Sequence, residues 1–362
     1  MVQTNDINAE SRAWASLLLS TMSVVAWRSF QLLLGFGTLT LAGLYFKQDS
    51  LLYFPEIGNM PRDPARNPRG YRSPADHQLP YEDIRITCED GVSLHAWLMF
   101  RGKNSSSSSS TPTIIFFHAN AGNMGIRLPN AIQMLRRLEV NILMVEYRGY
   151  GRSDNVAPNE SGLKLDGQAT LRYVQNHPKI DPTNVFLFGR SLGGAVTFAT
   201  AEYAQENSNG RGTNNIHPLK GVIVENTFTS IPDMVDHLMP LVAKVKSLIL
   251  AIQWNTMEIV PTLACPVLYL AGSRDEIVPH SHMLQLHQLT TRSILNRLHV
   301  INRGTHNESW SQGGEMYWDA FKSFLAGAIS ISKNDVQIRH QSEVIASEGI
   351  ASEVGESIKK EL

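Results

Sequence analysis

The sequence predicts an α/β domain with a mostly parallel central sheet flanked by helices, preceded by one transmembrane helix. Three observations support this prediction. Short, continuous apolar runs alternate with helical stretches, as in parallel sheets that are buried on both faces. A Gly-x-Ser-x-Gly turn at residues 189–193 separates a strand-like run from a helix of small residues. Near the N-terminus, 18 successive residues carry no charge.

Length and composition fit one large domain with extensions. The chain has 362 residues, and 43% of them are hydrophobic, which is enough for a substantial core. The formal net charge of -1 shows no excess of basic residues, so nucleic acid is not an expected partner. Cys88 and Cys265 are far apart and form no CxxC pattern, so neither a zinc site nor a disulfide framework is indicated. We expect no metal and no cofactor.

The uncharged stretch at 29–46 is predicted to be an uncleaved transmembrane anchor, with an N-terminal segment at 1–28 before it. As a helix the stretch measures about 27 Å, just sufficient for the bilayer core. Arg28 and Lys47 bracket it, and aromatic residues occupy both interface positions. A cleaved signal peptide fits poorly because the stretch starts late and ends in Tyr-Phe-Lys, and a buried helix is the other alternative. The flanking charges do not decide the orientation.

Residues 47–80 are predicted to be a linker, because they are rich in Pro, Arg and Gly and show no periodicity. The folded domain is expected at 81–330. It begins with an antiparallel hairpin at 81–87 and 92–100, joined by an Asp-Gly turn. A serine run at 104–110 is expected to be a flexible loop, and the first buried strand, TIIFF, follows it.

The loop after this strand reads HANAGN at 118–123 and leads into a helix from about residue 125 to 138. In an acyl-transfer enzyme this loop supplies one backbone N–H of the oxyanion hole, and the residue after the nucleophile supplies the other. We therefore assign Asn120 and Leu192 as the backbone donors, although a simple Gly-Asn turn explains the loop equally well. His118 is expected to be a structural hydrogen-bonding residue, because the catalytic base should come later in the chain.

The alternation of strand and helix then continues. Strands are expected at 141–147 and 181–188, with a helix at about 160–177 between them. The polar, Gly-rich segment 148–154 lacks the Gly-Lys-Ser/Thr of a phosphate-binding loop. We interpret it as a structural connection along one side of the site.

The second of these strands enters the Gly-x-Ser-x-Gly turn. Gly189 and Gly193 flank Ser191 because a nucleophile elbow needs a strained backbone and a close approach of strand and helix. The turn lifts the Ser191 hydroxyl above the sheet edge, and the next helix directs its first N–H groups at an oxyanion formed there. Ser191 is therefore the candidate nucleophile. Taken alone, the motif also fits an ordinary Gly-rich turn between strand and helix.

After a strand at 220–225, the alternation of strands and helices is interrupted by a largely apolar helical stretch at 226–257. We predict a small lid or acyl-binding wall here, since the Met and Leu content suits an apolar pocket. Plain core packing explains the same side chains equally well. They are Met234, Met239, Leu241, Leu248, Ile249 and Trp254.

The catalytic acid and base are expected in the last two strand-end loops. A strand at 266–271 leads to Asp275, and the last strand, 298–301, leads to His306. The order Ser191, acid, His is the hydrolase order, and each residue follows a predicted strand. One His or Asp alone would be weak support, but three candidates in order at strand ends are a specific pattern.

Glu225 and Glu276 are rival acids, the first because it also ends a strand and the second because it neighbours Asp275. We prefer Asp275 as the acid. Its place in the loop after a strand and its separation from His306 match the arrangement expected for the nucleophile-elbow enzymes.

Several longer motifs accompany these residues along the chain. They are LLYFP at 51–55, HANAGN at 118–123, EYRGYGRSD at 146–154, GRSLGGAV at 189–196, ENTFTS at 225–230, GSRDEIVP at 272–279 and GTHNESW at 304–310. With the anchor, they resemble the serine α/β-hydrolases over about residues 40–327. More narrowly, they resemble the membrane-anchored group that includes α/β-hydrolase domain-containing protein 13 and its fungal and plant relatives.

This resemblance implies the α/β-hydrolase fold with a small helical lid, and a triad of Ser191, Asp275 and His306. One departure is Ala119, where such proteins usually have Gly; its extra methyl group would tighten the oxyanion loop. The implied activity is hydrolysis of an acyl ester or acyl-thioester through an acyl-enzyme.

Membrane tethering and the apolar insertion favour a lipid ester or a protein-bound palmitoyl group as substrate. The expected partners are the lipid bilayer and a small acyl-ester or acyl-protein substrate. A serine peptidase is the less favoured enzyme, because the chain has room for only a small lid. A non-catalytic, membrane-tethered binding or scaffold module is the alternative from another class, and the intact Ser, Asp and His argue against it.

The C-terminal tail at 331–362 is polar and charged, and we expect a solvated helix or disorder there. Its last residues, KKEL, resemble a dilysine retrieval signal if they are cytosolic and a Lys-Asp-Glu-Leu-type signal if they are lumenal. Both indicate the endoplasmic reticulum. Asn104, Asn159 and Asn307 lie in Asn-x-Ser sequons, which matter only in a lumenal domain. A glycan on Asn307 would obstruct the neighbouring His306.

Overall fold

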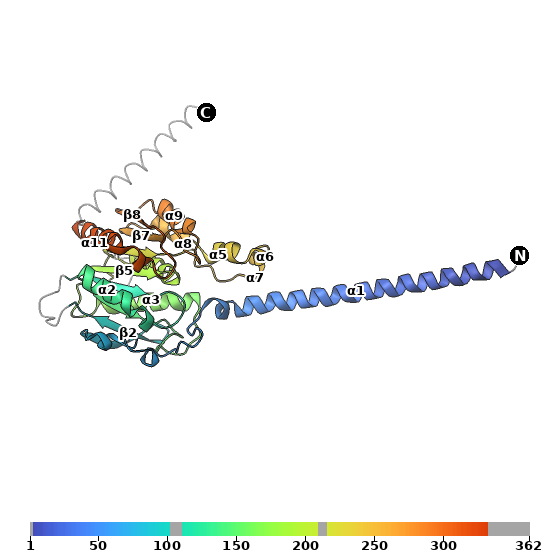
Figure 1. The fold of residues 1–362 in the computed structure, drawn as a ribbon, viewed down its shortest axis with the longest axis horizontal. Coiled ribbons are helices and arrows are strands. Elements are labelled where there is room, and N and C mark those ends of the chain that lie inside the picture. Colours follow the sequence, from blue (N-terminus) through green and yellow to red (C-terminus); the bar gives the residue numbers. More distant parts are fainter. Residues whose placement is uncertain (1–2, 102–110, 209–215, 332–362) are drawn as a thin grey trace, which may run out of the picture.

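The computed structural model describes residues 3–101, 111–208 and 216–331 of the chain. One long helix, α1 (Gln3–Leu52), projects from an α/β domain that holds the other described elements (Figure 1). The predicted serine loop, the sequon at Asn104 and the C-terminal tail beyond residue 331 lie outside the described residues.

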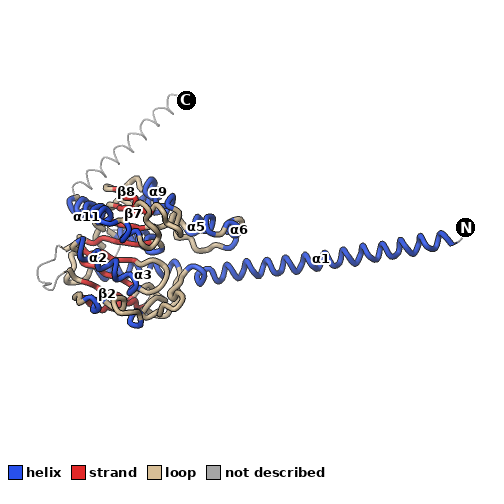
Figure 2. Tube along the Cα trace, in the orientation of Figure 1, coloured by secondary structure: helices blue, strands red, loops and turns tan. Residues whose placement is uncertain are grey.

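An eight-stranded sheet forms the centre of the domain, as Figure 2 shows, with the order β1-β2-β4-β3-β5-β6-β7-β8. β1 and β2 pair in antiparallel fashion, as do β2 and β4, and all other neighbours are parallel. This confirms the predicted hairpin and mostly parallel sheet. The strands are β1 (Tyr81–Thr87), β2 (Ser93–Met99), β3 (Thr113–Phe117), β4 (Asn141–Val145), β5 (Val185–Arg190), β6 (Gly221–Glu225), β7 (Val267–Gly272) and β8 (Asn296–Ile301).

Helices cover both faces of the sheet, which explains why its inner strands are apolar throughout. On one face, α2 (Leu128–Leu138) and α11 (Gly314–Ser330) pack on alternate strand residues such as Phe116 and Phe188. On the other face, α3 (Glu160–Gln175), α4 (Leu192–Asn207) and α9 (His280–Leu289) pack on the remaining ones, such as Phe117 and Leu187. Every residue of β3 to β7 is buried.

The helix α1 is longer than the uncharged stretch predicted as the anchor. It continues past residue 46 to Leu52, so the predicted linker begins as helix. The helix ends just before Phe54-Pro55, because a residue that precedes proline is driven out of the helical conformation. The chain then wraps onto the domain with two short 3-10 helices, Pro64–Arg66 and Pro74–His77.

The predicted insertion at 226–257 consists of short helices. They are α5 (Ile231–Leu238), α6 (Pro240–Ala243), α7 (Lys246–Ile249) and the start of α8 (Thr256–Ile259). Pro240 prevents α5 and α6 from forming one helix. The insertion projects on the side of the domain from which α1 leaves (Figure 1), and α1 contacts α7.

The apolar residues of the insertion divide into two groups. Met234, Ile249 and Trp254 are buried, so they serve as wall or core. Met239, Leu241 and Leu248 are exposed, and neither a pocket wall nor core packing accounts for them. The sequence interpretation treated both groups alike, because apolar composition does not tell which side of a short helix faces the domain.

Candidate active site

Ser191 lies between the end of β5 and the first turn of α4. Its backbone has φ 55° and ψ −122°, a region that non-glycine residues rarely adopt and that occurs where surrounding structure imposes it. The Ser191 N–H donates to the carbonyl of Glu225 at 3.0 Å, and Thr227 Oγ1 donates to the Ser191 carbonyl at 2.8 Å. Both partners come from the end of β6 and the residues after it, so the neighbouring strand fixes the strained turn.

The two glycines of the motif are required by close contacts. A Cβ on Gly189 would lie 2.1 Å from the carbonyl oxygen of Gly193. A Cβ on Gly193 would lie 2.1 Å from the carbonyl oxygen of Phe117, at the end of β3. Both contacts are to backbone atoms, which cannot move aside. The elbow is therefore built by the approach of α4 to β3 and β5, as the motif predicts.

His306 and Asp275 are brought together by the loops after β8 and β7. His306 Nδ1 lies 2.8 Å from Asp275 Oδ2 and 3.0 Å from Oδ1. Because an ionised carboxylate only accepts, Nδ1 carries the hydrogen and Nε2 is left as the basic nitrogen. Both side chains are buried. Asp275 Oδ1 also accepts the backbone N–H groups of Ile277 and Val278, at 2.9 and 2.8 Å, which hold the carboxylate in place.

The two rival acids are engaged elsewhere. Glu225 is buried, pairs with Arg190 at 3.0 Å and accepts the hydroxyl of Tyr317 at 2.7 Å. Glu276 Oε2 accepts the backbone N–H of His306 at 3.1 Å, so it contacts the histidine but not its ring. Of the three carboxylates, Asp275 alone is bonded to the imidazole within the described residues.

Ser191 and His306 lie at the carboxyl ends of β5 and β8 on the same edge of the sheet. Among the described residues, His306 Nδ1 is hydrogen-bonded to Asp275, and no hydrogen bond joins its ring to Ser191 Oγ. Nucleophile and base often lie further apart without substrate than in the reacting complex.

Asn226, which the sequence interpretation did not single out, joins the end of β6 to the loop that carries His306 and to the end of β7. Its Nδ2 donates to the carbonyls of Thr305 and His306, at 3.1 and 3.0 Å, and to Ser309 Oγ at 3.1 Å. Its Oδ1 accepts the N–H of Gly272 at 2.7 Å. The residue follows β6 directly, and its φ of 49° suits asparagine, which tolerates the left-handed region. An Asn immediately after a buried strand was the available signal.

The predicted oxyanion donors occupy two places around the elbow. Leu192 is the first residue of α4, where helical N–H groups have no partner in their own helix. Asn120 lies in the loop after β3. Within the described residues, neither backbone N–H has a hydrogen-bond acceptor. Both therefore remain available to a ligand at the N-terminus of α4.

The side chain of Asn120 makes hydrogen bonds on its own, independently of its backbone N–H. Its Oδ1 accepts the hydroxyl of Tyr150 at 2.7 Å and the backbone N–H of Phe54 at 3.2 Å. Its Nδ2 donates to the carbonyl of Leu52, the last residue of α1. The amide thus fastens the loop after β3 to the end of α1.

His118 and Ala119 are the first two residues of the same loop and are both buried. His118 Nδ1 is 2.7 Å from the Ala119 carbonyl, and Nε2 is 3.4 Å from Glu146. Its own carbonyl accepts the hydroxyl of Tyr147 at 2.8 Å. These contacts hold the end of β3, and they leave the imidazole no approach to Ser191 as a base.

No metal or disulfide chemistry is indicated in the described part of the chain. No three His, Cys, Asp or Glu side chains are grouped there as a metal site requires. Cys88 and Cys265 are both free thiols. Burial raises the pKa of each to about 12, so both remain protonated at neutral pH.

Comparison with known proteins identifies relatives over most of the chain. Protein bem46 of Schizosaccharomyces pombe is 35% identical over 293 residues, which cover 80% of this chain and 89% of bem46. The alpha/beta hydrolase domain-containing protein WAV2 of Arabidopsis thaliana is 34% identical, covering 80% of this chain and 92% of WAV2. An uncharacterized membrane protein of Saccharomyces cerevisiae is 30% identical, covering 83% and 97%. No protein-family model matches the chain.

Solved structures show the same fold. The esterase Pf2001 of Pyrococcus furiosus superposes with a TM-score of 0.56 over 74% of this chain and 98% of the esterase. The two sequences are 18% identical, so this likeness concerns the fold.

Proposed function

The chain belongs to the α/β-hydrolase superfamily, and from this premise we propose that it is a membrane-anchored serine hydrolase that cleaves an acyl ester or acyl-thioester. The triad consists of Ser191, Asp275 and His306. The observation that carries the proposal is the strained backbone of Ser191 between β5 and α4, at the N-cap position of that helix.

The reaction follows from the placement of these groups. His306 Nε2 removes the Ser191 proton while Oγ attacks the acyl carbonyl, and the N–H groups of Asn120 and Leu192 stabilise the oxyanion. Asp275 keeps Nδ1 protonated and stabilises the imidazolium. Protonated His306 then gives its proton to the leaving alcohol or thiol. Water, deprotonated by the same nitrogen, releases the acid from Ser191.

The substrate class is proposed from the surroundings of the site. α1 contains one span, Trp14–Leu52, that is long and apolar enough to cross a membrane, and none of its most apolar window is buried. A bilayer position favours a lipid ester or the palmitoyl-thioester of a membrane protein. We propose the endoplasmic reticulum as the site of this membrane, with support from the KKEL motif at 359–362.

The test is labelling of the detergent-solubilised full chain with a fluorophosphonate, which reacts with activated serines. We expect labelling of the wild type and its loss in both Ser191→Ala and His306→Ala. Ser311→Ala is the matched control, because Ser311 is an exposed serine shortly after the loop that carries His306. Its labelling should equal that of the wild type.

Labelling lost only in Ser191→Ala would contradict the assignment of His306 as the base. A folded wild type that does not label would favour the non-catalytic binding module over the hydrolase. If labelling behaves as expected, hydrolysis of a series of esters and thioesters of increasing acyl length identifies the substrate class.

A further inference from the structure

The position of α1 in a bilayer can be derived from its own residues. The span Trp14–Leu52 has 39 residues, about 58 Å as a helix, whereas the bilayer core measures about 30 Å. Only part of α1 therefore lies in the core. The stretch without charge runs from Ser29 to Phe46 and measures about 27 Å, so it fits the core with Arg28 and Lys47 outside it.

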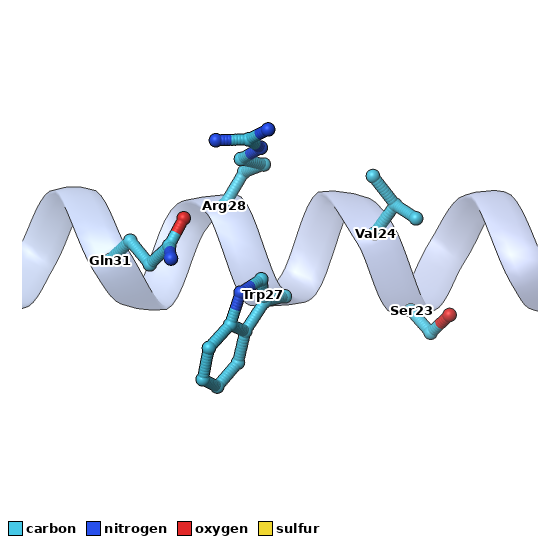
Figure 3. Close-up of a pocket in the computed structure, with 5 residues that line it drawn as sticks. All are labelled: Ser23, Val24, Trp27, Arg28 and Gln31. Atoms are coloured by element: carbon cyan, nitrogen blue, oxygen red, sulfur yellow. The ribbon is translucent and has the colours of Figure 1, made fainter.

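Aromatic residues at both ends support this placement. Trp27 stacks on Phe30 with ring centroids 5.8 Å apart, and Tyr45 meets Phe46 edge-on at 5.3 Å. Trp and Tyr concentrate at the two membrane interfaces. Figure 3 shows Trp27 and Arg28 leaving α1 on different sides, together with Ser23, Val24 and Gln31. All five belong to one helix, so the hollow between them has no opposite wall, and we interpret this region as the interface distant from the domain.

The domain meets α1 at the opposite interface. Gln48, one turn beyond Tyr45, accepts the backbone N–H groups of Ala251 and Ile252 through Oε1, at 2.8 and 3.0 Å. α7 contacts α1 directly. Leu41 and Leu44 on the preceding turns are half-buried, whereas Leu39 and Phe46 are exposed. The insertion therefore lies beside α1 at the level where the uncharged stretch ends.

The outer side of the insertion is apolar and exposed. Leu238, Met239, Leu241 and Leu248, which we call the apolar tip, come from α5, α6 and α7 and the residue between α5 and α6. Leu241 is 84% and Leu248 72% exposed. Soluble surfaces carry single apolar side chains, whereas several large ones on one short segment indicate a covered surface.

The charged residues around the apolar tip are compatible with a position at the membrane interface. Lys246 and Asp236 neutralise each other in an ion pair of 2.5 Å. Lys244 is exposed, and a lysine beside apolar side chains extends its ammonium group to the lipid headgroups. The remaining titratable groups of α5 to α7 are His237, exposed at the end of α5, and Asp233 in its first turn.

We propose that the apolar tip is a second membrane contact, which inserts into the interface of the bilayer that α1 crosses. The occupant is lipid, because α1 and the Gln48 bonds fix the insertion at the level where the bilayer begins. The contact holds the side of the domain that carries the insertion against the bilayer. The inference rests on the anchor in the proposed function but not on catalysis.

The experiment places an environment-sensitive fluorophore on single introduced cysteines of the full chain in phosphatidylcholine proteoliposomes that contain doxyl-labelled lipid. Leu241→Cys and Leu248→Cys report on the apolar tip. Leu39→Cys, in the exposed middle of the anchor, is the positive control. Met316→Cys on α11 is the matched negative control, since Met316 is 71% exposed but lies on a helix remote from α1 (Figure 1). The native thiols, with pKa about 12, compete little for a maleimide at neutral pH.

We expect blue-shifted emission and lipid quenching at positions 241 and 248, several-fold stronger than at 316 and approaching that at 39. Quenching at 241 and 248 no greater than at 316 would overturn the proposal. If position 39 is quenched in that case, the anchor stands and the apolar tip alone is rejected. If position 39 is also unquenched, the anchor is rejected with it. Fluorophosphonate labelling of the same variants reports separately on the hydrolase.

Discussion

The candidate active site and the C-terminal end of α1 are built in opposite ways. Ser191, Asp275 and His306 each sit in a short loop that follows a strand of one sheet, and hydrogen bonds between adjacent strand ends hold them. The foot of α1 is held by residues distant in sequence: Trp254 Nε1 donates to the hydroxyl of Tyr53 at 2.9 Å, across 201 positions. Local sequence therefore encodes the candidate site, whereas the attachment of the domain to α1 depends on contacts between segments that are distant in sequence.

The two regions nevertheless share one residue. The backbone N–H of Asn120 is available at the elbow, while its side chain bonds to Leu52, Phe54 and Tyr150. The end of α1 therefore contacts the loop that carries the predicted oxyanion donor. Four predictions separate the two regions, beginning with the largest expected effect.

Replacing the acid should affect chemistry alone. We expect Asp275→Asn to lower kcat for a water-soluble ester by about 10⁴-fold, because the amide favours the wrong imidazole tautomer. Glu276→Gln keeps an acceptor for the His306 N–H and should cost less than about tenfold. Steady-state kinetics measures both. Equal losses in the two variants would show that the acid is shared, and would contradict the preference for Asp275.

The elbow should be sensitive to a single methyl group. In Gly193→Ala the new Cβ would meet the Phe117 carbonyl at 2.1 Å, so β3 and α4 must separate. We expect a stability loss of about 1–3 kcal/mol and a labelling rate lower by about 100-fold, as the nucleophile is displaced. Thermal unfolding and the time course of fluorophosphonate labelling provide the two numbers.

Gly327→Ala in α11 is the control for that change. Its Cβ would meet the flexible ends of two side chains, Leu295 at 3.3 Å and Arg297 at 3.5 Å. Alanine favours the helix over glycine by about 0.5–1 kcal/mol. Stability should hold or rise, with labelling unchanged. If both glycine variants label at the wild-type rate, close packing at the elbow does not control the nucleophile.

The same contrast explains what could be predicted from the sequence. The strand runs, the elbow glycines and the order Ser191, Asp275, His306 follow from local composition and spacing, and the structure places all three residues at one sheet edge. Asn226 was missed, because its four hydrogen bonds join loops that are far apart in sequence. The outward side of the insertion was missed for a similar reason, since periodicity is undefined in helices of four residues.

The hydrogen bond between Tyr53 and Trp254 allows a test of how the end of α1 is attached to the domain. Tyr53→Phe removes the acceptor, and Trp254→Phe removes the donor but also leaves a cavity. A double-mutant cycle isolates the bond, for which we expect a coupling of about 1 kcal/mol in urea unfolding at fixed detergent concentration. Turnover of a soluble ester by Tyr53→Phe should stay within about threefold of the wild type. A loss of turnover comparable to that of Asp275→Asn would show that the bond at the end of α1 also controls the reaction, so the two regions would not be independent.

The smallest effect is expected from a change of pH, which should alter the stability of the insertion where it begins after β6. His282 on α9 is buried, and its Nδ1 accepts the backbone N–H of Thr229 at 3.2 Å and lies 2.7 Å from Thr229 Oγ1. The Thr229 hydroxyl, which has a single hydrogen, donates it to Asp233 at 2.6 Å, in the first turn of α5. A protonated Nδ1 cannot accept the N–H, so the neutral imidazole secures the start of the insertion.

Burial lowers the pKa of His282, against the opposing fields of Asp233 and Asp275, so the folded protein binds this proton less readily than the unfolded chain. The stabilisation is therefore complete above the unfolded value of about 6.5 and is lost as pH falls below it. We expect hydrogen exchange at residues 229–238, corrected for intrinsic rates, to rise on acidification while exchange at the elbow helix α4 does not. His282→Gln should abolish this pH dependence. An equal rise in α4 would mean that acid loosens the elbow and the insertion together, and the two regions would then form one cooperative unit.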